Sequence, residues 1–329
     1  SFWIAPHVMT YSGVTLMVLL SFGVLAWTTL RPAAAAGDVV RVLGLTSTRG
    51  FHLAAWGIAL TVLAAPIDDL WHRLFGIDVT LWSPPHLLGL LGAAINTLGC
   101  FLIAREVYPA TSRAGVAAIL VTGALLFTGL HLVVQPAFRI AYLQGGVWFH
   151  FYSILAPLLL PVAYVATARL SGSRWAPAVV LIGAVALGLV GQQLARLGFD
   201  LLQPVSVIQE EMLKDPTSPI AVANVVARRN GTVAGATTSV AQLLGLIPLA
   251  AMVAVDARRR PVAATVAYAL VLFGLMAVRL GLLPAYQALV PGPGDTVVAL
   301  ALTLAAGVAG GFGAGRLAAL LEPAPPRAR

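Results

Sequence analysis

Long apolar runs dominate this chain of 329 residues and limit the folds that it can adopt. A helix needs about 20 consecutive apolar residues to cross the hydrocarbon core of a bilayer, and nine runs approach or exceed that length. They lie at about residues 8–30, 50–67, 86–104, 114–135, 147–168, 176–198, 233–255, 262–283 and 296–320. The runs are continuous and do not alternate, which argues against strands. Each run is therefore expected to form a helix, in which the backbone N–H and C=O groups bond to one another. The sequence therefore predicts an all-α, polytopic transmembrane helical bundle of about nine helices.

We expect residues 1–329 to form a single integral membrane domain. Hydrophobic residues make up 59% of the chain and charged residues only 10%, with a mean hydropathy of +0.91, which excludes an ordinary soluble domain. Most connections are short and contain Pro or Gly. The exception is a long outer-side loop at about residues 199–232, in which Val205 to Leu213 could form a short interfacial helix before Asp215-Pro216. We interpret this loop as a cap or a partner-binding segment.

The net charge of +8 is distributed unevenly over the two sides of the membrane. With the amino terminus outside, 13 of the 20 basic residues fall in the loops after the first, third, fifth and seventh runs or at the carboxyl end. They are Arg31, Arg41, Arg49, Arg105, Arg113, Arg169, Arg174, Arg258, Arg259, Arg260, Arg316, Arg327 and Arg329. The positive-inside rule then predicts an outer amino terminus and a cytoplasmic carboxyl terminus in the plasma (inner) membrane. The basic excess therefore needs no nucleic-acid partner, and the lipid bilayer is the expected surrounding.

A stripe of small residues marks the last apolar run. Gly307, Gly311 and Gly315 recur every four residues, so they share one face of a helix and allow another helix to approach closely. The contact could lie within the chain or between chains. The same stripe leaves open whether the protein forms a homo-oligomer or joins other membrane subunits.

The most informative cluster of polar residues lies between the second and third runs, in the segment DDLWHRLFGIDVTLWSPPH at residues 68–86. Ionisable groups at membrane depth are costly, so they tend to pair, bind an ion or line a pathway. Asp68 and His72 are four residues apart, which places both side chains on one face of a helix. Ser83-Pro84-Pro85 is typical of a helix start and places His86 in the first turn of the next helix. The positive end of that helix favours a neutral imidazole, which is the form that binds metals.

Local charge also favours a cation in this segment. Asp68 and Asp69 are adjacent and Asp78 adds a third acid, whereas Arg73 is the one basic residue nearby. A mixed set of carboxylate and imidazole ligands suits copper, zinc or iron. The alternative interpretation is a solvated helix end with an Asp–Arg ion pair, surrounded by the polar and aromatic belt that membrane proteins place at the interface.

The pattern Asp68, two residues, Trp71-His72, five residues, Asp78, then Pro84 two residues before His86, resembles the metal-binding segment in the C subunit of copper membrane monooxygenases, the particulate methane and ammonia monooxygenase group. The resemblance covers about 19 residues, and the step from His72 to His86 is one residue longer here than in that family. It implies that Asp68, His72 and His86 are metal ligands, with Asp78 as a further acid, and that copper is the metal.

The first functional hypothesis is thus a metal-binding subunit of a membrane oxidoreductase that acts on a small apolar molecule or ammonia. The sequence assigns no catalytic residues and contains no soluble copper domain, so such an enzyme would need partner subunits. Three alternatives remain open at this stage. The first is a transporter or channel with a polar pathway, the second is a haem protein with two histidines as axial ligands, and the third is a structural subunit without a metal. The pathway would use Asn96, Gln192, Gln193, Arg196 and Arg279, and the haem ligands would come from His72, His86, His131 and His150.

Overall fold

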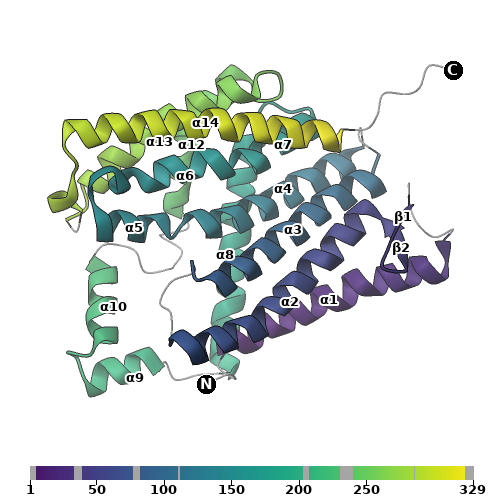
Figure 1. Ribbon diagram of the computed structural model, residues 1–329, viewed down its shortest axis with the longest axis horizontal. Coiled ribbons are helices and arrows are strands. Elements are labelled where there is room, and N and C mark those ends of the chain that lie inside the picture. Colours follow the sequence, from purple (N-terminus) through teal and green to yellow (C-terminus); the bar gives the residue numbers. More distant parts are fainter. Residues whose placement is uncertain are drawn as a thin grey trace.

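The computed structural model describes residues 5–32, 39–76, 82–109, 112–202, 207–229, 240–284 and 286–322. Within these residues, eight helical segments are long and apolar enough to cross a membrane, which confirms the all-α, polytopic bundle. Most of the long helices have similarly inclined axes, and α1 begins at the opposite end of the bundle from the one where α14 ends (Figure 1). The spans are α1 (Ala5–Leu30), α2 (Arg49–Phe75), α3 (Pro84–Val107), α4 (Arg113–Val134), a broken span from Gly146 to Ser171, α8 (Ala176–Leu202), α13 (Pro261–Gly281) and α14 (Pro293–Leu321).

The run expected at residues 233–255 is shorter in the described part of the chain. A 3₁₀ turn, η3 (Gln242–Gly245), leads into α12 (Leu246–Val255), whereas the first residues of the predicted run lie outside the described ranges. The structure therefore gives eight long spans and one shorter apolar helical segment where the sequence predicts nine helices.

The span from Gly146 to Ser171 is not one helix but three pieces. The 3₁₀ turn η2 (Gly146–His150) is followed by α6 (Phe151–Leu159) and α7 (Pro161–Ser171), and a short helix α5 (Ala137–Gln144) precedes them. Pro161 is the first residue of α7, where its missing N–H breaks the hydrogen-bond ladder of a continuous helix. The predicted single helix is therefore interrupted near its middle.

The described part of the long loop expected at residues 199–232 is more helical than the sequence predicts. α8 continues to Leu202, and α9 (Val207–Lys214) and α10 (Pro219–Arg229) follow at the end of the bundle where α1 begins (Figure 1). Asp215 ends α9, and its carboxylate accepts hydrogen bonds from the backbone N–H and hydroxyl of Thr217 at 2.9 and 2.6 Å. These bonds lower the pKa of Asp215 from its usual value. The short helix expected before Asp215-Pro216 is thus present, with α10 as an addition.

A β-hairpin also joins α1 to α2, which the apolar pattern did not predict. Strand β1 (Val39–Val42) pairs antiparallel with β2 (Leu45–Thr48), and Leu43 and Gly44 turn the chain with positive φ angles. The hairpin is fixed to the bundle because the Thr46 N–H donates to the Thr29 hydroxyl at 2.8 Å. It lies outside the spans, so the prediction of helical spans is unaffected.

The main core lies among α4, α6, α7, α8, α12 and α13, where buried Leu, Val, Ala and aromatic side chains form one cluster. The glycine stripe of α14 packs within the same chain. A Cβ on Gly311 would lie 2.7 Å from the Val262 Cα of α13, and a Cβ on Gly315 would lie 3.0 Å from Pro261 Cγ. The intrachain contact anticipated for this stripe is confirmed.

Candidate metal centre

Close packing of α2 against α3 determines which residues meet at the end of this helix pair. The helices run antiparallel, and glycines on both sides replace side chains at the contact. A Cβ on Gly92 would lie 2.6 Å from the Thr61 backbone nitrogen, and a Cβ on Gly89 would lie 3.5 Å from the Ala64 Cβ. One further turn along α2 and one further turn back along α3 lead from this last pair to Asp68 and His86. The register of the helices therefore brings these two residues together.

Helix α2 continues eight residues beyond the predicted end, so Asp68 and His72 lie on its last turns rather than in a loop. The helix ends at Gly76, which has a φ of 82° and donates its N–H to the His72 carbonyl at 3.0 Å. The His72 ring makes a second contact here, with Nδ1 3.1 Å from the Gly76 carbonyl oxygen. A carbonyl can only accept, so Nδ1 carries a hydrogen in this contact, and in the neutral form of the ring Nε2 is the nitrogen with the lone pair.

The start of α3 follows the expected pattern. Ser83 is the N-cap residue, Pro84 and Pro85 occupy the first two helical positions, and His86 is third. Proline suits these positions because their N–H groups have no partner within the helix. The backbone thus holds His86 in the first turn of α3, beside the last turns of α2.

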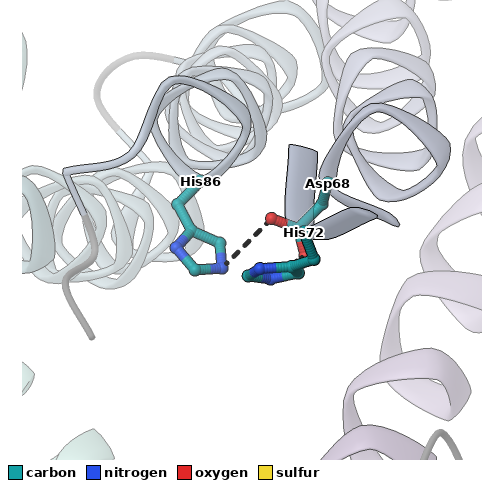
Figure 2. A group of neighbouring side chains, drawn as sticks. All are labelled: Asp68, His72 and His86. Atoms are coloured by element: carbon teal, nitrogen blue, oxygen red, sulfur yellow. Dashed lines mark ion pairs between the residues drawn. The ribbon is translucent and has the colours of Figure 1, made fainter. Parts of the chain in front are cut away.

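The three side chains point toward one another across the gap between the two helices, as Figure 2 shows. His72 Nε2 lies 3.4 Å from Asp68 Oδ2, and His86 Nε2 lies 3.5 Å from Asp68 Oδ1. One ligand atom from each residue lies within 4.8 Å of the other two. About 30% of each side chain is exposed, so the cluster is partly open to its surroundings.

Among the described residues, the charge on Asp68 has the two imidazoles beside it but no arginine or lysine. Arg73 forms its ion pair with Asp69 at 2.6 Å instead. Asp68 Oδ1 is buried and has no hydrogen-bond partner among the described residues. A buried carboxylate oxygen without a partner is costly. The site therefore favours a cation between Asp68 and the two imidazoles.

The spacing of the donor atoms suits a transition metal. Ligand atoms about 2.1 Å from a tetrahedral metal ion are about 3.4 Å apart, close to both Asp68–His separations. All three ligand atoms lie within 4.8 Å of one another, so small side-chain movements would complete the set. Two imidazoles and one carboxylate form a donor set used for zinc, copper and iron.

The other described histidines lie away from the cluster, and Asp78 falls outside the described residues. His7 is exposed and contacts Tyr11, His131 stacks on Phe127, and His150 stacks on Phe273. On the other side of the bundle, His52 Nε2 lies 3.1 Å from the Val40 carbonyl.

Sequence reasoning missed the Gly76 carbonyl, which orients the His72 ring. The helical spacing of four residues between His72 and Gly76 is the one signal that could have indicated it. Of the residues proposed for a polar pathway, Asn96 has a packing role, because its side-chain amide donates to the Ala54 carbonyl at 2.8 Å and joins α3 to α2.

The fold and this cluster define an integral membrane protein, a helical bundle with an Asp–His–His cluster at the end of one helix pair. No protein-family model, curated protein or solved structure matches the chain.

Proposed function

We propose that the protein is a metal-binding subunit of a membrane oxidoreductase and that Asp68, His72 and His86 hold a copper ion. The observation that carries the proposal is the convergence of three ligand atoms within 4.8 Å around a buried carboxylate oxygen that has no hydrogen-bond partner among the described residues. The His72–Gly76 contact supports it, because a metal-ligating histidine usually donates its other ring N–H to an oxygen.

Copper is the preferred metal for two reasons. At a given nitrogen and oxygen site, Cu²⁺ binds more tightly than the other divalent first-row metals. The order and spacing of Asp68, His72 and His86 also resemble those in the metal-binding segment of copper membrane monooxygenases. Zinc and iron accept the same donors, so metal analysis of the purified protein must distinguish copper from them.

Three protein ligands leave coordination positions open, which is typical of sites that bind an exchangeable molecule rather than of closed structural sites. The partial exposure of the three side chains is consistent with access by a small molecule. Copper bound there would supply the oxygen chemistry of a monooxygenase, with other subunits providing electrons. Asp68, His72 and His86 would fix its position through the packed ends of α2 and α3.

A haem between His72 and His86 fits this geometry less well. A haem macrocycle must lie between its two axial nitrogens. The Asp68 carboxylate lies within 3.5 Å of both rings and stands in that space. An absorbance spectrum of the purified protein would show a Soret band if the haem alternative were correct.

Metal analysis of the purified protein tests the proposal. We expect about one copper per chain after equilibration with copper and dialysis, together with an electron paramagnetic resonance spectrum of Cu²⁺ with nitrogen ligands. His72→Ala should lose the bound copper, whereas His7→Ala, at an exposed histidine outside the cluster, should keep it. If His72→Ala binds as much metal as the parent, the structural-subunit alternative replaces the proposal. Stoichiometric zinc or iron with copper excluded would retain the site and reject the copper assignment.

A further inference from the structure

A second polar site lies inside the bundle, away from α2 and α3. A cavity of about 100 Å³ lies among α4, α5, α6, α7, α8 and α13, and residues of the η3 turn line part of it. None of the described residues that line it belongs to the metal centre. At roughly 10–15 Å³ for each water-sized sphere, this volume is enough for a small organic molecule rather than for one or two waters.

Hydrogen-bonding side chains are concentrated on the cavity wall. Three tyrosines, Tyr152, Tyr164 and Tyr268, line it together with His131 and Gln242. Tyr164 and Tyr268 are only 2% and 3% exposed, and their ring centroids are 5.9 Å apart. Each of the five side chains can donate a hydrogen bond. Polar groups at this depth in a bundle are costly unless they have partners, so they indicate a polar ligand.

The charge of the cavity wall indicates the sign of the charge that the ligand carries. Arg279 lines it from the last turn of α13, and no carboxylate lies among the described lining residues. A guanidinium stays protonated at any physiological pH. The carboxyl end of α13 offers only about half of a negative charge, so it offsets the arginine in part. A cationic ligand would be repelled, and a neutral one would leave the guanidinium without a counter-ion.

A second cavity extends the first toward α8. It has a volume of about 110 Å³ and shares Phe127, His131, Gln135 and Gln242 with the first. Beyond these shared residues it is lined by Thr128 and by the less polar residues Leu132, Ala184, Val185 and Gly188. The Phe127 ring stacks on both His131 and Tyr164, at centroid distances of 5.5 and 5.2 Å. A ligand that fits both cavities carries a negative head near Arg279 and a short apolar body near Val185.

We propose that this pair of cavities binds a small monocarboxylate, with the carboxylate beside Arg279 and the hydrogen-bond donors of Tyr152 and Tyr268. An arginine fork can donate two parallel hydrogen bonds to a carboxylate, which makes this pairing stronger than a contact between neutral groups. The site is independent of the metal centre, because it uses different helices.

Equilibrium dialysis of the purified protein in detergent against radiolabelled butyrate tests the proposal. We expect saturable binding of one butyrate per chain, with butyramide and butylammonium at least tenfold weaker, because neither has a carboxylate for Arg279. Arg279→Gln should weaken butyrate binding at least tenfold, and Arg279→Lys should fall between it and the parent. Arg196→Gln removes an exposed arginine that does not line either cavity and should stay within twofold of the parent.

Equal affinity for butyrate and butyramide would overturn the assignment, as would unchanged binding in Arg279→Gln or the absence of saturable butyrate binding. Tyr268→Phe gives a second measure if Arg279→Gln fails to fold, because it removes one donor and retains the ring. It should weaken butyrate more than butyramide, and an equal effect on both would contradict the proposal. Copper stoichiometry should remain unchanged in all of these variants, which separates this result from the test of the metal centre.

Discussion

Asp68 and Asp69 are adjacent in the sequence but have different surroundings in the structure. Asp69 points to Arg73, in a pair whose side chains are 61% and 74% exposed. Asp68 points between His72 and His86, and one of its oxygens is buried without a hydrogen-bond partner in the described part of the chain. The helical rotation of about 100° between neighbours separates the two roles. One acid belongs to the surface, and the other to the cluster.

This difference predicts that the same substitution has a large effect on metal affinity at Asp68 and almost none at Asp69. Asp68→Asn removes the negative ligand while keeping the size of the side chain, so metal affinity should fall at least about 100-fold, more than is usual for loss of an outer-shell partner. Asp69→Asn removes an exposed ion pair worth about 0–1 kcal/mol, and metal affinity should stay within about twofold. Titration against a competing chelator measures both. Equal losses in the two variants would mean that general negative charge, rather than ligation by Asp68, attracts the metal.

The residues of the cluster could be named from the sequence, whereas their support could not. Spacing of four residues and the Ser83-Pro84-Pro85 helix start indicate where Asp68, His72 and His86 lie. The contact between His72 Nδ1 and the Gly76 carbonyl depends on a positive φ at Gly76, and side-chain periodicity carries no information about that angle. Whether Asp78 contributes also remains a prediction, because it lies outside the described residues.

At the scale of helices, the close packing of α2 against α3 sets the relative positions of the three residues of the metal centre. Gly57, Gly92 and Gly99 allow the two backbones to touch, and the amide of Asn96 links α3 to the Ala54 carbonyl. Hydropathy predicted both helices but placed the end of α2 at residue 67, because Asp68 and Asp69 interrupt the apolar run. The helix continues because an Asp69–Arg73 pair at this spacing stabilises it, and it ends where Gly76 turns the chain.

Two alanine substitutions on α3 test whether the close packing of α2 and α3 holds the metal centre together. A Cβ on Gly92 would lie 2.6 Å from the Thr61 nitrogen and 2.7 Å from the Gly57 carbonyl oxygen, so Gly92→Ala must push the helices apart. We expect destabilisation of about 1–3 kcal/mol, as in other overpacked interfaces, and metal binding about tenfold weaker because His86 moves with α3. A Cβ on Gly89 would meet only the Ala64 Cβ, at an ordinary 3.5 Å.

Gly89→Ala is therefore the matched control, although it lies closer to His86 than Gly92 does. Thermal unfolding in detergent and a copper titration should show little change in Gly89→Ala. If Gly92→Ala also retains both properties, the close approach of the helices does not hold the site.

For the molecule as a whole, the apolar pattern correctly predicted a bundle of transmembrane helices. It was less accurate for the number of long spans, because the described residues contain eight of them and one shorter apolar helix. Pro161 breaks one span, and the described part of the run at residues 233–255 is only the segment Gln242–Val255. That segment has a length of about 20 Å at 1.5 Å per residue. It leads from the cavity beside Arg279 to the turn where Arg258 Nη1 donates to the Gly172 carbonyl. Asp256 shapes this turn, and the hydrogen bond from Arg258 lowers the pKa of its carboxyl to about 2.

Orientation in the membrane is the last prediction and follows from the distribution of arginines. Ser173 precedes α8 and Thr217 follows it. The 27 residues of α8 extend about 40 Å, so the helix can place these two residues on opposite sides of a bilayer. With the amino terminus outside, Thr217 faces the exterior and Ser173 faces the cytoplasm beside the arginine-rich turn. The chain has one cysteine, Cys100, so Cys100→Ser gives a background for single-cysteine labelling. In intact cells, a membrane-impermeant maleimide should label Thr217→Cys and should reach Ser173→Cys only after permeabilisation. The reverse pattern would place the metal centre at the cytoplasmic face and contradict the assigned orientation.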